Sequence, residues 1–195
     1  MGNLAPGVAD HGDVDTNDDF AEKHADFRRR GIEVEFTVGG LLKYVGAVHL
    51  KAVKRFVVAD NFKKGNVVGS REIVWIGESF QFHYGDVVEV DVSPRIVFVW
   101  ELFKRSLDEP VITILGGESD PKTEIHLAHQ FQMMELGKQA HARLDGYANF
   151  GYKRSPKDGK LWVPDWDVDG EGLGVGAHSS SNPRDWRGGD RVSSG

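Results

Sequence analysis

The sequence contains no cysteine and no long apolar segment. Without cysteine the chain has no disulfide bonds, no thiolate nucleophile and no cysteine-ligated zinc. Its apolar runs, such as residues 95–100, have the length of a strand and fall far short of the roughly 18–20 residues that span a membrane. The first residues lack a basic region followed by an apolar run, so we expect neither a secretory signal nor a membrane partner. These absences leave the compartment open.

Positive charge is also scarce, because 24 Lys and Arg face 30 Asp and Glu, which gives a formal net charge of −6. This balance argues against generic binding to nucleic acid or to an anionic membrane. One basic stretch does interleave cations with aromatic residues, as nucleic-acid-binding faces do. Its members are Lys51, Lys54, Arg55, Phe56, Phe62, Lys63 and Lys64. The alternative is that these lysines protect a strand edge from aggregation. The acidic balance favours that alternative, so nucleic acid is not an expected partner.

Catalytic motifs are missing as well. No serine lies in a G-x-S-x-G pattern, and no P-loop is present. The glycine-rich residues 172–176 follow no predicted strand and open no predicted helix. Carboxylates are numerous, but the sequence singles out no acid/base pair. We therefore predict a protein without enzymatic activity, and we name no catalytic residue.

What the sequence does contain is a β-rich region, residues 28–150. Residues 32–38 alternate strictly between apolar and polar side chains, which is the period of a half-buried strand. Residues 96–100 are apolar on both faces, which indicates the most buried strand. Further strands are predicted at residues 71–76, 80–84, 87–92 and 111–115. Short strands at this spacing predict a mainly β (α+β) fold, an antiparallel sandwich or small barrel.

One helix is predicted at about residues 121–146, at the C-terminal end of this region, where it packs on the sheet. Asp120 is placed to cap its N-terminus, and Pro121 to occupy the first helical position. An apolar stripe at helical spacing is formed by Met133, Leu136, Ala140, Leu144 and Tyr147. Gly146 is placed to end the helix.

Two polar segments flank this domain. Residues 1–27 begin with 20 residues that carry aspartates but no Lys or Arg, and residues 151–195 are rich in Gly, Ser, Asp and Arg. Such compositions bury too little apolar surface to offset the entropy of ordering, so we expect extended N- and C-terminal arms.

The C-terminal segment nevertheless contains Trp162, Trp166 and Trp186. A packed tryptophan buries on the order of 200 Å². These rings are therefore candidate anchors for a partner or a neighbouring subunit. The alternative is that the segment folds back on its own domain.

Two patterns resemble metal sites. Residues 165–170 match the D-x-D-x-D-G start of a calcium loop, so Asp165, Asp167 and Asp169 are candidate calcium ligands. Position twelve of that loop is Gly176, where calcium needs a bidentate Glu, so a polar turn is the competing interpretation. His126 and His129 lie three residues apart, a spacing that metal ligands use and that exposed helix histidines share.

A small β domain with long arms and no catalytic motif favours a non-enzymatic structural subunit of a large repetitive assembly. Its most concrete form is a virion component of a tailed bacteriophage, in the capsid, connector or tail, where it forms homo-oligomers or contacts other subunits. The alternative is a ligand-binding protein or an enzyme with calcium in the C-terminal segment. A pocket that joins His126, His129 or the aspartates would favour that alternative.

Overall fold

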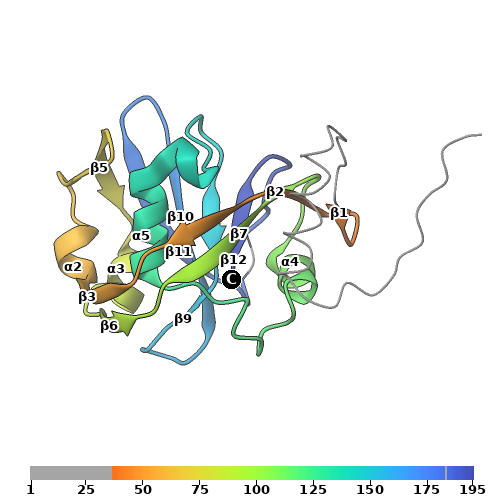
Figure 1. Ribbon diagram of the computed structural model, residues 1–195, viewed down its shortest axis with the longest axis horizontal. Coiled ribbons are helices and arrows are strands. Elements are labelled where there is room, and N and C mark those ends of the chain that lie inside the picture. The colour runs from red at the N-terminus through yellow and green to blue at the C-terminus, as the bar shows by residue number, and fades with distance from the viewer. Residues whose placement is uncertain (1–36, 183) are drawn as a thin grey trace, which may run out of the picture. The chain divides into compact units, whose positions relative to one another are not determined.

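A long two-stranded ribbon runs through the fold (Figure 1). In the computed structural model, which describes residues 37–182 and 184–195, strand β2 (Leu42–Leu50) pairs antiparallel with β7 (Arg95–Leu102). Further along the same two chain segments, β3 (Val53–Val57) pairs antiparallel with β6 (Val88–Val92) as a separate sheet. Alternate residues of β2 are buried, as expected for a strand with one face on the core. The arm predicted at residues 1–27 lies outside the described residues.

The large sheet has ten strands in the order β1-β2-β7-β12-β8-β10-β11-β5-β4, with β9 paired to β10. Its remaining strands are β1 (Thr37–Val38), β4 (Val67–Val68), β5 (Arg71–Ile76), β8 (Asn149–Gly151), β9 (Lys153–Arg154), β10 (Leu161–Val168), β11 (Leu173–Ser179) and β12 (Arg191–Ser194). The pairs β8–β12 and β5–β11 are parallel. The fold is therefore strand-rich α+β, with 41% strand. An antiparallel sandwich or barrel is not formed, because the described sheet is mixed and does not close.

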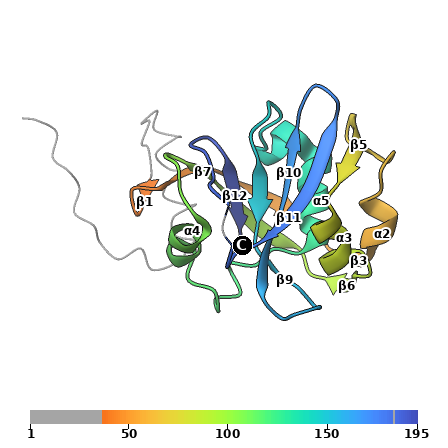
Figure 2. The same ribbon diagram turned by 180° about the vertical axis from the view of Figure 1, so that it is seen from behind.

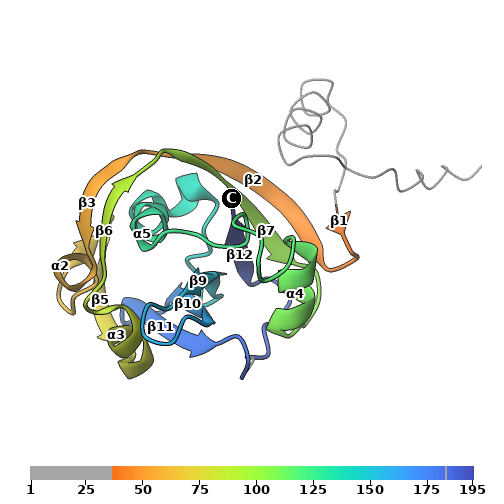
Figure 3. The same ribbon diagram turned by 90° about the horizontal axis from the view of Figure 1, so that it is seen from below.

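The sheet and the ribbon curl around helix α5 (Leu127–Leu136), which lies inside the curve (Figure 3). Because β-structure surrounds it, α5 buries residues on several faces, including Leu127, Met133 and Met134. The predicted helix at residues 121–146 is shorter in the structure. Before α5, the Asp120 carboxylate accepts a hydrogen bond from the N–H of Lys122 at 2.8 Å, which forms a turn in place of a helix cap.

The end of α5 is set by Gly137, whose φ of +54° is outside the right-handed helical region. The chain continues as a short 3-10 helix, η1 (Gly137–Ala140), which ends before His141 at a φ of +56°. The apolar spacing that extended to Tyr147 in the sequence therefore spans several local structures, and only its first part is α-helical.

Three shorter helices complete the described elements: α2 (Val58–Asn61), α3 (Glu78–Tyr84) and α4 (Asp108–Ile114). The strands predicted at residues 80–84 and 111–115 are wrong, because these segments lie in α3 and α4. In α3 the buried residues Phe80 and Tyr84 are four apart, which is the spacing of one helix face. None of the described helices is long and apolar enough to cross a membrane.

An aromatic cluster forms part of the core beside α5. The rings of Phe62 and Phe80 lie 4.9 Å apart, and those of Phe62 and Phe131 lie 5.3 Å apart. Phe56, which is 6% exposed, joins them at 6.0 Å from Phe62. Phe56 and Phe62 belong to the basic stretch of the sequence. Because both are buried, they offer no surface on which a nucleic-acid base could stack.

The strand predicted to be most buried lies within β7, between β2 and β12. Val97, Phe98 and Val99 are each at most 3% exposed, so the continuous apolar run does correspond to a strand covered on both faces. Ile96, at the start of the run, is 39% exposed and marks where this cover ends.

Residues 151–195 form strands and not an extended arm (Figure 2). This segment supplies β9, β10, β11 and β12, and β12 lies between β7 and β8 in the middle of the large sheet. The segment forms strands because its side chains alternate. In β10, Trp166 and Val168 are buried, and Asp165 and Asp167 lie on the opposite face of the strand. The polar composition of the segment belongs to its outward side and its turns.

Candidate functional site

The three candidate calcium ligands lie on β10 and just beyond its end. Asp165 is paired with Arg184, whose Nη1 donates to Asp165 Oδ2 at 2.7 Å. Asp169 Oδ1 accepts hydrogen bonds from the N–H groups of Glu171 and Gly172 at 2.8 and 3.1 Å, which closes a tight turn. Among the described residues, no group of three His, Cys, Asp or Glu side chains is arranged to hold a metal ion. The residues of the sequence motif thus form the end of a strand and a turn.

The three tryptophans of the C-terminal segment pack on their own domain. Trp186 is 1% exposed and stacks on Phe150, with ring centroids 3.8 Å apart and planes 1° from parallel. Trp166 is 4% exposed in the main core cluster. Trp162 is half-buried against the ring of His83, at 3.5 Å between centroids. The idea of exposed docking anchors therefore gives way to the alternative that this segment folds back.

A buried carboxylate connects Trp186 to the rest of the fold. Asp108, which is fully buried at the start of α4, accepts hydrogen bonds at Oδ1 from Trp186 Nε1 (2.8 Å) and from the Tyr152 hydroxyl (3.0 Å). Its other oxygen lies 3.3 Å from His178 Nε2. A carboxylate enclosed by three hydrogen-bonding side chains stabilises the fold and is closed to a substrate, so we assign Asp108 a structural role.

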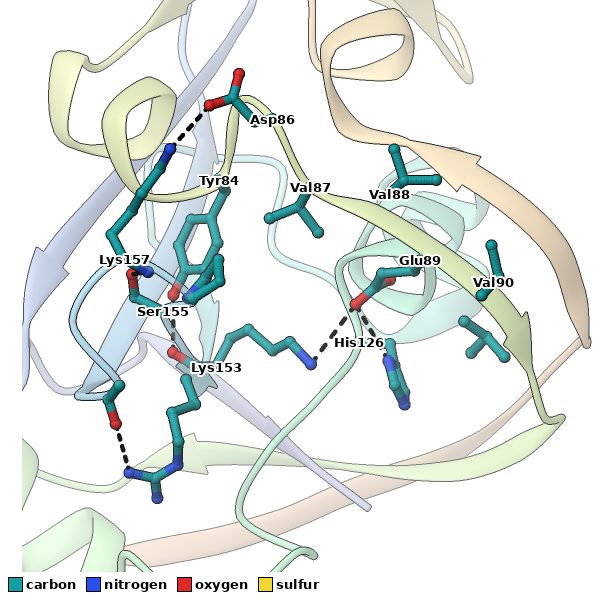
Figure 4. Close-up of a pocket in the computed structure, with 14 residues that line it drawn as sticks. Tyr84, Asp86, Val87, Val88, Glu89, Val90, His126, Lys153, Ser155 and Lys157 are labelled. Carbon is teal, nitrogen blue, oxygen red and sulfur yellow. Dashed lines mark hydrogen bonds and ion pairs between the residues drawn. The ribbon is translucent and has the colours of Figure 1, made fainter.

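A groove of about 750 Å³ opens between β6 and the loop that joins β9 to β10 (Figure 4). We call it the β6 groove. Its apolar wall includes Val88 and Val90, and its polar floor is formed by Glu89, His126 and Lys153. A second cavity of about 530 Å³ shares Val90, His126 and Lys153 with it. Because they share these lining residues, the two cavities adjoin each other beside β6.

The floor is organised by Glu89, which is 8% exposed. Its carboxylate accepts hydrogen bonds from the N–H groups of Leu127 (3.2 Å) and Ala128 (2.8 Å), the first residues of α5. The two side chains that flank it are His126, whose Nδ1 lies 3.1 Å from Oε1, and Lys153, whose Nζ lies 3.6 Å away. Burial opposes ionisation, but the His126 and Ala128 hydrogen bonds and the Lys153 charge together hold the pKa of Glu89 below its ordinary value. Glu89 is therefore an ionised cap for α5.

His126 and His129, which the sequence singled out, do line the second cavity together. Their rings are 5.7 Å apart and nearly perpendicular. His126 has a side chain that is 41% exposed, and Glu89 orients it. The nearby hydroxyl of Ser155 is hydrogen-bonded to His83 Nδ1 at 2.8 Å and accepts a hydrogen bond from the N–H of Lys157 at 3.1 Å.

His129 gives the fold a dependence on pH. It is fully buried, and neither ring nitrogen has a partner at hydrogen-bonding distance. Burial lowers the pKa of His129 below its ordinary 6.5, and the nearby His126 and Arg95 add to the effect. The neighbouring backbone of Lys51, as distinct from its side-chain charge, and the carboxylate of Glu89 oppose it. The unfolded chain therefore binds a proton below pH 6.5 that the folded chain does not, so stability is complete above pH 6.5 and falls as the pH drops towards the lowered pKa.

We expect the His129→Leu variant to be at least as stable as the parent at pH 7, because an unpaired buried polar ring is replaced by an apolar side chain. Between pH 7 and pH 5 its free energy of unfolding should fall less steeply, by up to about 1.4 kcal/mol per pH unit. Urea unfolding at several pH values measures this slope. Glu89 affects stability in a different pH range. Because its pKa is lowered in the folded chain, its contribution is lost only as the pH falls below its ordinary pKa of 4.5. An unchanged slope between pH 7 and pH 5 would contradict the role of His129.

Sequence reasoning missed Glu89 because Glu89 alternates with valines along its strand. Such a pattern predicts that the valines face the core and that Glu89 faces solvent. The structure inverts this assignment at two positions, where Val88 and Val90 are 45% and 61% exposed. The signal that could have found Glu89 is the lack of a capping side chain at His126, directly before α5, which leaves the first N–H groups of the helix in need of an acceptor.

Comparison of the chain with protein-family models, curated proteins and solved structures finds no significant match. The functional argument therefore rests on the geometry of the chain itself.

Proposed function

We propose that this protein is a non-enzymatic structural subunit of a large repetitive assembly, most concretely a virion component of a tailed bacteriophage in its capsid, connector or tail. In this proposal the β6 groove receives an extended segment of a neighbouring copy, which adds a strand to β6. The observation that carries it is a strand edge with exposed apolar side chains beside a groove. Such an edge is a template for pairing with another chain.

The backbone of β6 supports this proposal. Among the described residues β6 pairs only with β3. The N–H of Val58 donates to the carbonyl of Val87 at 3.0 Å, so Val87 faces β3. Because hydrogen-bonding groups alternate along an antiparallel strand, the N–H and C=O groups of Val88 and Val90 point to the other side, towards the groove.

The sequence also contains a suitable donor segment. Residues 32–36 have the apolar alternation of a strand and lie outside the described residues. An added strand of this kind would place Ile32, Val34 and Phe36 on one face and Glu33 and Glu35 on the other. The groove wall carries Lys153, Arg154 and Lys157, whose positive charge is complementary to that of the two glutamates. Each of these cations already has an acidic neighbour. Apolar contact and main-chain pairing therefore supply most of the expected affinity.

The proposal predicts an oligomer in solution, with a mass that is a multiple of the 21.6 kDa chain. A lysine at an exposed edge position opposes strand addition, so Val90→Lys should raise the dissociation constant at least tenfold. Val34→Asp, on the donor side, should do the same. A matched control is Val67→Lys, because Val67 is 69% exposed on the edge strand β4 and does not line the groove.

Light scattering over a range of protein concentrations measures these masses. A parent protein that stays monomeric, or a Val90→Lys variant that assembles like the parent, contradicts strand addition at β6. Truncation after residue 150 is not an informative alternative, because it would remove β9 to β12 from the sheet.

A second candidate, a ligand-binding protein, is favoured by one specific observation. His126 and His129 share a cavity with Arg95 and Lys153, so polar groups from α5, β7 and β9 converge on one space. If the parent protein is monomeric at every concentration, this candidate takes precedence over the assembly role.

A further inference from the structure

An exposed tryptophan marks a second cavity, on the outer face of the sheet. Trp75 on β5 is 57% exposed, although Ile73 on the same strand is fully buried. Two residues of one strand that are two apart normally share a face. Here the register shifts between Leu173 and Gly174 of β11, which pair with Ile73 and Trp75, so Val74 is an extra residue. This bulge turns the indole outward.

Glycines form the floor beneath the indole. A Cβ at Gly77 would lie 2.8 Å from Trp75 Cη2, which is too close for any side chain. At Gly176 a Cβ would lie 3.6 Å from Trp75 Cζ3 and 2.9 Å from Asp165 Oδ1. A Cβ at Gly174 would lie 2.9 Å from Asp167 Oδ1. The ring therefore lies across β11 next to two carboxylates and close to the backbone of Gly77.

The pairing of the strands puts these groups in rows. Asp167 on β10 is opposite Gly174 on β11, which is opposite Trp75 on β5, and Asp165 is opposite Gly176. The cavity beside them has a volume of about 640 Å³, and Asp165, His178, Arg184 and Trp75 line it. The Asp165–Arg184 pair, at 2.7 Å, presents an acceptor and a donor side by side.

This combination of an apolar ring and flanking polar groups matches the chemistry of a sugar. A pyranose has one apolar C–H face, which packs on an aromatic ring, and a rim of hydroxyl groups, which carboxylate and guanidinium groups bind through paired hydrogen bonds. Carboxylates outnumber the guanidinium group here, with Glu78 also at the cavity. That excess of negative charge disfavours an acidic sugar.

We propose that this cavity binds a neutral glycan, with a hexose ring stacked on Trp75 and its hydroxyl groups hydrogen-bonded to Glu78 and to the Asp165–Arg184 pair. The inference is independent of strand addition at β6, because the two surfaces share no lining residue. It adds a binding activity towards carbohydrate to the proposed structural role.

The test is affinity electrophoresis of the full chain in gels that contain a soluble β-glucan, a mannan or a galactomannan, with polygalacturonate as the acidic counterpart. We expect retardation by at least one neutral polymer and weaker retardation by polygalacturonate. Trp75→Ala should raise the dissociation constant for the retained polymer at least tenfold, and Glu78→Gln, at the same cavity, at least threefold. Phe82→Ala is the matched control, because Phe82 is 65% exposed and does not line this cavity.

Circular dichroism establishes whether each variant is folded. If Trp75→Ala does not fold, Glu78→Gln still tests the site. Three outcomes overturn the proposal. They are a lack of retardation by all three neutral polymers, equal binding by both cavity variants and the parent, and polygalacturonate binding as strong as that of the neutral polymers.

Discussion

Replacement of Trp186 by alanine should lower the free energy of unfolding by about 3–5 kcal/mol, because a large, fully packed aromatic side chain is lost from the interior. The indole is 1% exposed, stacks on Phe150 and donates a hydrogen bond to Asp108. For a chain of this size the melting temperature should fall by roughly 6–20 °C. Urea and thermal unfolding followed by circular dichroism measure both quantities.

The matched control is Trp75→Ala, since Trp75 is 57% exposed and its removal should change stability by less than about 1 kcal/mol. If Trp186 were an anchor that only a partner buries, its replacement would leave the isolated chain as stable as this control. That result would return the C-terminal segment to the role of a docking arm.

Asp108→Ala should be comparably destabilising, by about 3–5 kcal/mol, for a different reason. The substitution removes little apolar contact, but it leaves the Trp186 N–H and the Tyr152 O–H in the interior without their acceptor. Each buried donor without a partner costs about 1–3 kcal/mol. The measurement is again urea unfolding, at a pH above 7 so that histidine protonation does not contribute.

Asp185→Ala is the control for the loss of a carboxylate, because the Asp185 side chain is 47% exposed in an ion pair with Arg105 and should contribute less than about 1 kcal/mol. The double variant of Asp108 and Trp186 gives a further check. The two residues share a hydrogen bond. The losses of unfolding free energy in the two single variants should therefore add up to more than the loss in the double variant. Strict additivity would mean that the bond is absent in solution.

The strands that the sequence predicts well are those with β-branched residues and clear alternation. Residues 71–76 form β5, and residues 96–100 lie in β7 with Val97 and Val99 buried. Short apolar runs without strict alternation were ambiguous, since Phe80 and Tyr84 fit either a strand or one helix face. In that case tertiary packing, and not local pattern, decides the structure.

The C-terminal segment illustrates a conflict between composition and periodicity. Its content of Gly, Ser and Asp predicts an extended arm, whereas Trp166 and Val168 alternate with Asp165 and Asp167 as in a strand. Composition misleads here because the polar and glycine residues lie on the outward face of β10 and β11, while the inward face is apolar. The alternation was present in the sequence and was the better guide.

Only parts of the two candidate sites could be predicted from the sequence. The spacing of His126 and His129 places them together, but Glu89, which orients His126, lies 37 residues away in the sequence. Trp75 and Asp165 line one cavity only because β5 pairs with β11 and β11 with β10. No local pattern encodes such pairings, because they depend on strand order.

The position of β12 determines when this protein can fold during its synthesis. Residues 191–194 fill the gap between β7 and β8, so the two halves of the large sheet share no direct strand pairing until those residues have left the ribosome. A chain made at about 5–20 residues per second holds the edges of both halves unpaired for several seconds. We therefore infer that the nascent chain is most prone to aggregation between the emergence of β8 and that of β12, and that the pairing of β12 completes the large sheet.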